Sequence, residues 1–202
     1  MNEGVDVQFD NEETAIVLVE FQKQWTERGL LHRLIKGQLA SRNVVKNTRR
    51  LVTTAREHGV TIIHAPLILD PHNKKGWLAY PTLGRFFTKD SWKSELVPGV
   101  FEDGDPIAAR GYYNYQAFDA FYKSELEQTL AEHNIQTMFI CGFATDQCPA
   151  KTMKTAIRKG ISPYLVGDCT ATFLGFLQTR AESKENGART VTSQEVMAAI
   201  TE

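Results

Sequence analysis

The residue of this 202-residue chain most suited to chemistry is Cys148, which lies between a predicted strand and a predicted helix. The strand is the short apolar run 138–141, which Gly142 ends, and Pro149 suits the first position of a helix. Cys148 therefore falls at a helix N-cap, where unpaired backbone N–H groups and the helix dipole favour a thiolate. We interpret Cys148 as a nucleophile; the alternative is a small apolar residue packed at the junction.

Two charged residues at the ends of other predicted strands could serve this cysteine. Glu20 lies near the end of the apolar run 15–21, AIVLVEF, and Arg110 ends the run 105–110, DPIAAR. Because the carboxyl ends of parallel strands meet at one edge of a sheet, we expect both residues to share a crevice with Cys148. There a thiolate could attack a carbonyl, a cation could hold the thiolate and a carboxylate could move protons. The alternative for Arg110 is a structural ion pair with Glu20.

The turn before Cys148 could also stabilise a developing negative charge. It contains Thr145 and Asp146, small polar residues that suit tight turns. The backbone N–H groups of Ala144 and Cys148 could point at one spot there and form an oxyanion hole. These residues together predict nucleophilic chemistry on a carbonyl group.

The rest of the sequence predicts the elements that position these residues. Apolar runs typical of buried strands alternate with amphipathic stretches typical of helices, which indicates a parallel sheet with helices on both faces. We predict strands at 15–21, 60–69, 105–110, 138–141, 161–167 and 189–192. We predict helices at 39–58, 118–134, 149–159 and 176–186, and a last helix capped by Ser193. The expected fold class is α/β, a three-layer α/β/α arrangement with a six-stranded, mostly parallel, Rossmann-like sheet.

Chain length limits the number of domains. With 202 residues, the chain can bury one sizeable core, so we expect a single domain at 1–202 with 1–12 as an extended N-terminal arm. The stretch 70–98 has weak periodicity, and we expect a long connection that covers the site. Its aromatic residues could instead only cap the core; they are Trp77, Tyr80, Phe86, Phe87 and Trp92.

Composition and charge limit the kinds of partner. The chain is 42% hydrophobic and 23% charged, and its net charge of −1 gives no basis for binding nucleic acid. We therefore expect a small-molecule substrate. The polar, acidic start does not resemble a signal peptide, and no apolar run could cross a bilayer, so we expect a cytoplasmic protein without membrane contact. Three cysteines fit reduced thiols better than a disulfide framework or a zinc site.

Four segments together resemble the isochorismatase-like cysteine hydrolases. They are the strand, acid and glutamine of 17–22, the strand that ends at Arg110, CGFATDQC at 141–148 and VGDCTATF at 166–173. The resemblance runs from about Ala15 to the end of the chain, and its sharpest part is G-x-A-T-D-x-C. It implies an isochorismatase-type fold with a six-stranded parallel sheet. It also implies hydrolysis of small amides, ureido compounds and related C–N bonds through a carboxylate, a lysine and a cysteine.

Carried over position by position, the resemblance places the nucleophile on Cys148, the carboxylate on Glu20 and the lysine on Arg110. The family usually has aspartate in the place of Glu20, which is one methylene longer. Arginine in the place of the lysine keeps the positive charge, but it does not lose a proton in a protein. The segment after Arg110 is also longer than usual, so Tyr113 or Tyr115 is the alternative occupant of that space.

The resemblance also implies features of the substrate pocket. Relatives commonly have a non-proline cis peptide before the alanine of the turn, which corresponds to Phe143–Ala144 here. An aromatic residue five positions after the acid lines their pocket, and Trp25 holds that place. We therefore expect Trp25, Tyr113 and Phe143 to line the pocket of this chain.

Metal binding and assembly are two further properties that relatives show. Some members bind a metal through D-x-H and a second histidine close behind. Asp70 and His72 supply D-P-H, but the next histidine is His133, so we attribute this match to coincidence and expect no metal and no cofactor. His64, inside a predicted strand, is more typical of a core or edge histidine than of a ligand. Because relatives often form dimers or tetramers, we expect a homo-oligomer.

These expectations combine into one leading hypothesis and two alternatives. The leading one is a cysteine hydrolase that cleaves a small amide or ureido C–N bond through a thioester on Cys148. Glu20 would act as general base and acid, and Arg110 would hold the thiolate. The first alternative is a weak or inactive homologue that acts in binding or assembly, because two triad positions are altered. The second is a vinyl-ether hydrolase that uses the acid alone, as relatives without the cysteine do.

Overall fold

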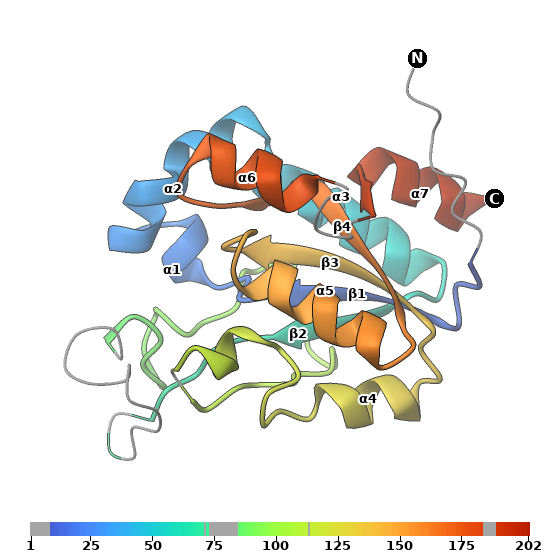
Figure 1. The fold of residues 1–202 in the computed structure, drawn as a ribbon, viewed down its shortest axis with the longest axis horizontal. Helices are drawn as coiled ribbons and strands as arrows, with labels where there is room; N and C mark the ends of the chain where they lie inside the picture. Colours follow the sequence, from blue (N-terminus) through green and yellow to red (C-terminus); the bar gives the residue numbers. More distant parts are fainter. Residues whose placement is uncertain (1–8, 71, 73–84, 113, 184–188) are drawn as a thin grey trace.

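The computed structural model describes residues 9–70, 72, 85–112, 114–183 and 189–202. Their centre is a sheet of five strands, all parallel, in the order β2–β1–β3–β4–β5 (Figure 1). The predicted α/β class and parallel sheet are therefore confirmed. The strands are β1 Thr14–Val19, β2 Thr61–Ala65, β3 Thr137–Phe143, β4 Ser162–Ala171 and β5 Thr190–Val191.

Helices cover both faces of the sheet, with α3 and α7 on one face and α4 and α5 on the other (Figure 1). None of the described helices is long and apolar enough to span a membrane. Besides one 3₁₀ turn, η3 at Gln116–Phe118, the helices are α1 Lys23–Thr26, α2 Leu30–Ser41, α3 Val44–Glu57, α4 Leu126–Glu132, α5 Cys148–Arg158, α6 Gly175–Glu182 and α7 Ser193–Thr201.

Strand β1 shows why the sheet lies at the centre of the fold. Its Ile16 and Leu18 side chains join the apolar cluster that α3 and α7 complete. The alternate residues Val17 and Val19 join the second cluster, which α4 and α5 complete. Because successive strand side chains point to opposite faces, a continuous apolar run fits a strand that is buried on both sides.

Gly142 allows β1 and β3 to come close at the edge that carries the candidate site. Its φ of +123° lies in a region that L side chains rarely adopt. A Cβ atom at this position would lie 1.9 Å from the backbone oxygen of Val19. The register between β3 and β4 also shifts here, between Ile140 and Gly142. Glycine is therefore required immediately before the turn that leads to Cys148.

The predicted sixth strand is a correction, because the described sheet has five strands. Residues 105–110 run beside β2 but form only two isolated parallel bridges, His64 with Ile107 and Leu67 with Arg110. Pro66 lies between these bridges and has no N–H to donate, so the ladder is interrupted. The segment still reaches the end of β2, and this placement brings Arg110 to the expected edge of the sheet.

Three predicted helices differ from the structure. The last helix, α7, has Thr192 as its N-cap, and the predicted cap Ser193 is its first residue. The expected helix at 39–58 is divided between α2 and α3, because Asn43 adopts a left-handed conformation with φ of +52° between them. In the expected helix at 118–134 only α4 is α-helical. Asp119 accepts a hydrogen bond from the backbone N–H of Phe121 at 3.0 Å, a local turn that competes with a helix.

His64 is a core histidine that connects β2 to the loop before residue 105. Its side chain is fully buried, and Nε2 lies 3.1 Å from Oδ2 of Asp105, which Arg56 also contacts at 2.6 Å. Burial lowers the pKa of His64 to about 4, although Asp105 acts in the opposite direction. The native protein therefore holds this imidazole neutral at pH 7.

We predict that His64 makes the fold less stable in mild acid. Unfolded His64 takes up a proton near pH 6.5 and folded His64 only near pH 4, so its contribution is constant above 6.5 and falls as the pH drops toward 4. The full shift corresponds to a loss of about 3 kcal/mol below pH 4, of which about 2 kcal/mol falls between pH 7 and pH 5. Urea unfolding at pH 7 and pH 5 measures the difference. His64→Gln should reduce this difference in the free energy of unfolding, whereas the exposed control His133→Gln should leave it unchanged. A difference in His64→Gln equal to that of the wild type would contradict the assignment of the pH dependence to His64.

Candidate active site

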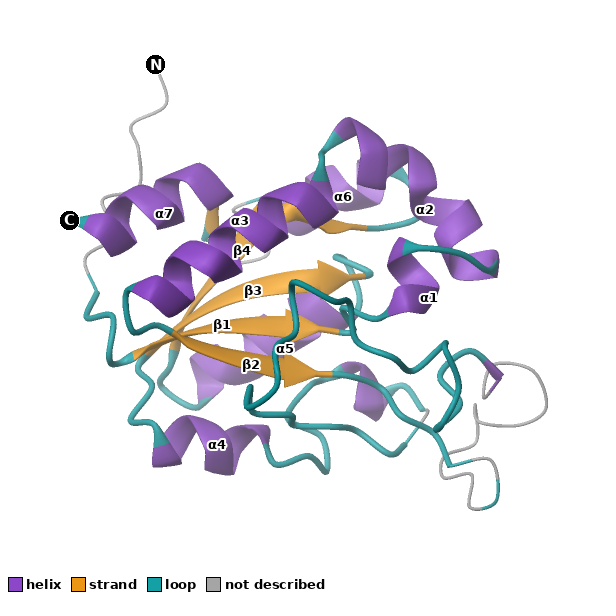
Figure 2. Ribbon diagram, turned by 180° about the vertical axis from the view of Figure 1, so that it is seen from behind, coloured by secondary structure: helices purple, strands orange, loops and turns teal. Residues whose placement is uncertain are grey.

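The three residues predicted to do chemistry converge at one edge of the sheet. Strand β1 lies between β2 and β3, and the carboxyl ends of the three strands point to the same edge, beside α1 (Figure 2). Glu20 directly follows β1, and Cys148 is the first residue of α5, which follows β3. Arg110 forms a bridge with Leu67, just after the end of β2. Glu20, Arg110 and Cys148 are 2%, 0% and 4% exposed. The structure thus brings a carboxylate, a guanidinium and a thiol together in a buried environment.

Arg110 is anchored by three protein oxygens. Its Nη2 atom lies 3.0 Å from Oε1 of Glu20 and donates to the Ala65 carbonyl at 3.0 Å. Nη1 donates to the Ala117 carbonyl at 2.5 Å. Its side chain is fully buried and is absent from the described wall of the cavity that Cys148 lines. Arg110 therefore fixes the Glu20 carboxylate from the side away from the cavity, and it connects the end of β2 to η3.

The backbone at Glu20 changes direction immediately after the strand. Glu20 adopts a left-handed conformation with φ of +56°, which is uncommon for a residue with a side chain. Its N–H donates to the Ala65 carbonyl at 3.1 Å, the same oxygen that Arg110 uses. Arg110 and Glu20 are therefore fixed against one backbone group, and the Glu20 side chain lines the cavity beside Cys148.

The structure corrects the expected state of Cys148. Burial raises the pKa of this thiol well above its usual value, the nearby Glu20 carboxylate raises it further, and Arg110 only partly opposes them. Helix α5 begins at Cys148 itself, with Gln147 as the N-cap, so the cysteine is not the cap residue. The sequence predicted a thiolate from the helix end alone, whereas desolvation in the folded protein raises the pKa and favours the thiol.

The turn between β3 and α5 is held against β4. The Phe143–Ala144 peptide bond is cis. The backbone N–H of Thr145 donates to the Ala171 carbonyl of β4 at 3.2 Å, and the N–H of Gln147 closes the turn on the Ala144 carbonyl at 2.8 Å. Ala144 and Cys148, whose N–H groups are the predicted oxyanion hole, both line the cavity.

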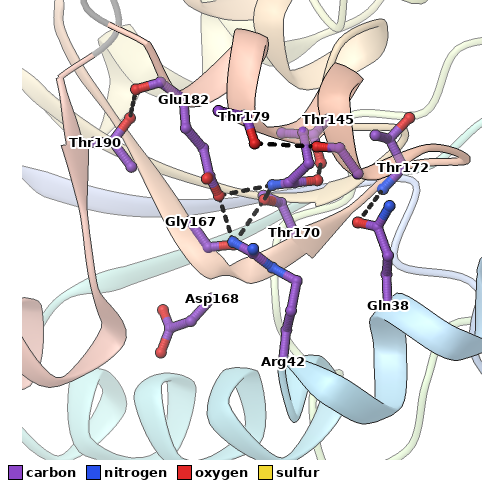
Figure 3. A network of polar contacts seen from close by, with 12 residues as sticks. Gln38, Arg42, Thr145, Gly167, Asp168, Thr170, Thr172, Thr179, Glu182 and Thr190 are labelled. Carbon is purple, nitrogen blue, oxygen red and sulfur yellow. Dashed lines mark hydrogen bonds and ion pairs between the residues drawn. The ribbon is translucent and has the colours of Figure 1, made fainter.

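A buried polar network behind this turn was not predicted from the sequence (Figure 3). The Thr145 hydroxyl donates to Oε1 of Gln178 on α6 at 2.7 Å. The amide nitrogen of Gln178 donates to Thr170 on β4 at 3.0 Å and to Glu182 at 2.8 Å. Glu182 in turn pairs with Arg42, which also donates to the Gly167 carbonyl at 2.8 Å. Gln178 is 2% exposed, so α6 and the turn are joined by desolvated hydrogen bonds.

The candidate site opens into a cavity of about 220 Å³, which we call the Cys148 cavity. Its polar residues are few, and most of its wall is aromatic or aliphatic. The described residues that line it are Glu20, Trp25, Leu31, Phe86, Phe87, Phe118, Ala144, Gln147, Cys148 and Phe173. A carbonyl compound that enters it would meet the thiol and the carboxylate at the same end.

Of the three residues predicted to line the pocket, only Trp25 is found in the described wall. Phe143 is fully buried and absent from the described wall, and it stacks on the Trp25 ring with a centroid distance of 5.7 Å. Side chains alternate along β3, and this one points into the core. Tyr113 lies outside the described residues. The alternative residue Tyr115 is 65% exposed and lines a separate surface hollow.

Several wall residues were not assigned from the sequence. Leu31, Phe118 and Phe173 come from three segments far apart in the chain, and no local pattern indicates that they meet. Phe86 and Phe87 belong to the long connection that we expected to cover the site, and this position agrees with that expectation. Elsewhere in that connection, the backbone N–H of His72 donates to Asp70 at 2.8 Å, a local turn.

Comparison with known proteins identifies the family. The family model described as Isochorismatase domain matches residues 14–195, so the chain belongs to the isochorismatase family. YwoC, an isochorismatase family protein of Bacillus subtilis, is 25% identical over 167 residues, which cover 81% of this chain and 80% of YwoC. RutB of Methylorubrum extorquens, a ureidoacrylate amidohydrolase, is 23% identical over 183 residues, which cover 81% of this chain and 72% of RutB.

The fold also matches solved structures. A cysteine hydrolase from Pseudomonas syringae pv. phaseolicola has a TM-score of 0.83 and 19% sequence identity, with 100% of this chain and 99% of that chain covered. The resemblance recognised in the sequence is therefore confirmed at the level of family and fold.

We predict that Gln178→Ala lowers the free energy of unfolding by about 2 to 3 kcal/mol, because it leaves buried partners on β4 and the turn without their hydrogen bonds. Guanidinium unfolding measures the change. Thr179→Ala on the same helix is the matched control; it removes an exposed hydroxyl and should cost less than about 0.5 kcal/mol. Equal effects of the two substitutions would show that the network does not hold the turn.

A second prediction concerns the state of the thiol. Glu20→Gln removes the negative charge beside Cys148 and leaves Arg110 unpaired, so the pKa of the thiol falls. At a pH below the pKa of the thiol, each unit by which this pKa decreases raises the thiolate fraction about tenfold. Iodoacetamide should therefore alkylate wild-type Cys148 more slowly at pH 7 than a free thiol, and the Glu20→Gln variant faster than wild type.

The controls for this experiment separate charge from access. Mass spectrometry should detect the label on wild type and not on Cys148→Ala, because the other two cysteines, Cys141 and Cys169, are fully buried. Glu12→Gln removes one exposed charge elsewhere and should leave the alkylation rate unchanged. Slower alkylation of Glu20→Gln than of wild type would contradict the assigned cause of the raised pKa.

Proposed function

We propose that this chain is a cysteine hydrolase that cleaves the C–N bond of a small amide or ureido compound through a thioester on Cys148. The observation that carries the proposal is that the Cys148 thiol and the Glu20 carboxylate line one cavity, with Arg110 anchoring Glu20 from behind. The relatives support the reaction class, because RutB is a ureidoacrylate amidohydrolase and a structural neighbour is a cysteine hydrolase.

The first half of the proposed reaction forms the thioester. Glu20 accepts the thiol proton as Sγ of Cys148 attacks the substrate carbonyl, which is necessary because the resting residue is a thiol. The negative charge that develops on the carbonyl oxygen faces the backbone N–H groups of Ala144 and Cys148. When the C–N bond breaks, Glu20 returns its proton to the leaving nitrogen, and ammonia or an amine departs.

The second half releases the acid. Glu20, again a carboxylate, takes a proton from a water molecule that attacks the thioester carbonyl. The C–S bond then breaks, and the proton held by Glu20 returns to Cys148. Arg110 takes no part in the proton transfers, because an arginine stays protonated in a protein. Its proposed role is to hold Glu20 in position and to oppose part of the rise in the pKa of Cys148.

One observation favours a second candidate, a catalytically weak or inactive homologue that acts in binding or assembly. Arg110 replaces the lysine that the resemblance implies, and its two terminal nitrogens are bonded to Glu20 and to two backbone carbonyls. The single domain, the cytoplasmic location and the homo-oligomeric state stay predictions from the sequence under either candidate.

The test is a screen of small primary amides and ureido compounds for release of ammonia, with wild type and Cys148→Ala in parallel. We predict that the substitution lowers kcat by at least about a thousandfold on any compound that wild type hydrolyses. Circular dichroism checks that the variant is folded, and mass spectrometry of acid-quenched wild type detects the acyl adduct on Cys148. Equal rates for the two proteins would exclude the thioester mechanism. If wild type hydrolyses none of the compounds, the second candidate is favoured.

A further inference from the structure

The Cys148 cavity is chemically divided into a small polar end and a large apolar wall. Of its ten described lining residues, seven are apolar: Trp25, Leu31, Phe86, Phe87, Phe118, Ala144 and Phe173. The other three are Glu20, Gln147 and Cys148, and two of these are the proposed catalytic groups. A substrate whose carbonyl meets the thiol must therefore place the rest of its structure against hydrocarbon.

We infer that the substrate is an uncharged amide or ureido compound whose remaining part is apolar and about the size of one ring. This inference rests on the proposed function, since it names the substrate class of the same site. Three features of the cavity favour such a substrate: the charge balance of its wall, the position of the nearby cations, and its size and shape.

The charge balance of the wall disfavours a charged substrate. Glu20 is the only charged group among the described lining residues, and Arg110 balances it from outside the wall. A substrate carboxylate would bring a second negative charge near Glu20, and no cation among the described wall residues would pair with it. An ammonium group would find its possible partner, Glu20, already bonded to Arg110. Burying an unpaired charge of either sign costs several kcal/mol, so neutral compounds are preferred.

Three cations of the described residues, Lys151, Lys154 and Arg158, line a neighbouring surface hollow. This hollow shares only Phe118 and Gln147 with the Cys148 cavity. The Lys151 ammonium donates to the Tyr115 carbonyl and lies 3.7 Å from the centre of the Tyr115 ring. Lys154 is exposed. These lysines are therefore absent from the described wall of the Cys148 cavity, although Lys151 lies near enough to Cys148 to interact with it electrostatically.

The size and shape of the cavity favour a compact, flat group. Its volume of about 220 Å³ is below the range of roughly 300 to 1,000 Å³ that is usual for drug-sized ligands. The Trp25 ring forms one side, with the rings of Phe87 and Phe173 at centroid distances of 6.3 Å and 5.8 Å. Aromatic walls in tilted arrangements accept a further ring by edge or face contact.

The test compares three carboxamides with one ring each, which differ in charge. They are benzamide, 4-carboxybenzamide and 4-(aminomethyl)benzamide, which are neutral, anionic and cationic at pH 7. Calorimetry with folded Cys148→Ala measures binding without turnover, and ammonia release by wild type measures kcat/KM. We expect benzamide to bind at least about tenfold more tightly than either charged compound. Equal or tighter binding of a charged compound, or no binding of any of the three, overturns the inference.

The two measurements separate this inference from the proposed function. If benzamide binds Cys148→Ala most tightly but wild type hydrolyses none of the amides, the substrate class stands and the hydrolase mechanism fails. If wild type hydrolyses 4-carboxybenzamide best and Cys148→Ala binds it best, the hydrolase stands and the inference fails.

A charge placed at the cavity wall gives an independent test. Phe173 is 37% exposed, so Phe173→Arg can add a cation at the wall without burying it fully. It should raise the ratio of anionic to neutral binding by about tenfold, because it supplies the missing partner for a carboxylate. Phe176→Arg is the matched control, since Phe176 is 68% exposed on α6 and is absent from the described wall. Equal changes in the two variants would show that Phe173 does not face the bound substrate.

Discussion

The buried ion pair between Arg110 and Glu20 is the contact on which the candidate site depends. Both side chains are almost completely removed from water, and additional hydrogen bonds offset part of the cost of desolvating such a pair. The carbonyl oxygens of Ala65 and Ala117 accept from the two terminal nitrogens of Arg110, whereas its buried Nε has no hydrogen-bond partner among the described residues. The pair therefore joins the ends of β1 and β2 to η3, and it fixes the position of the carboxylate next to the cysteine.

This arrangement assigns different tasks to the two charged residues. The resemblance to cysteine hydrolases implies an aspartate and a lysine at these places. This chain has Glu20 in place of the aspartate and Arg110 in place of the lysine, and both side chains are longer. Arg110 reaches three oxygens at once, which a single ammonium group on a shorter side chain would not do in the same geometry. In the proposed mechanism all proton transfer therefore falls to Glu20 and Cys148, and Arg110 acts through position and charge.

Much of the site could be predicted from the sequence because it depends on strand ends. Glu20, Arg110 and Cys148 each follow or end a recognisable apolar segment, and parallel topology then requires that they meet. The sequence of 105–110 does not distinguish two isolated bridges from a full strand, because the interruption comes from Pro66 in the neighbouring segment.

Tertiary features of the site could not be predicted in the same way. The wall at Phe118 and Phe173 is formed by segments that meet only in the folded chain. The state of Cys148 depends on burial, a property that the local helix-end pattern does not contain. The Gln178 network also joins residues 33 positions apart in the sequence, Thr145 and Gln178.

The raised pKa of Cys148 has a consequence for the lifetime of the protein. Peroxides and other oxidants attack a thiolate far faster than a thiol, and they attack exposed sulfur more easily than buried sulfur. In the proposed mechanism Cys148 stays protonated and 4% exposed between turnovers, which protects its sulfur from conversion to sulfenic or sulfinic acid. The same desolvation that delays formation of the nucleophile until Glu20 accepts its proton thus preserves the sulfur under oxidative stress.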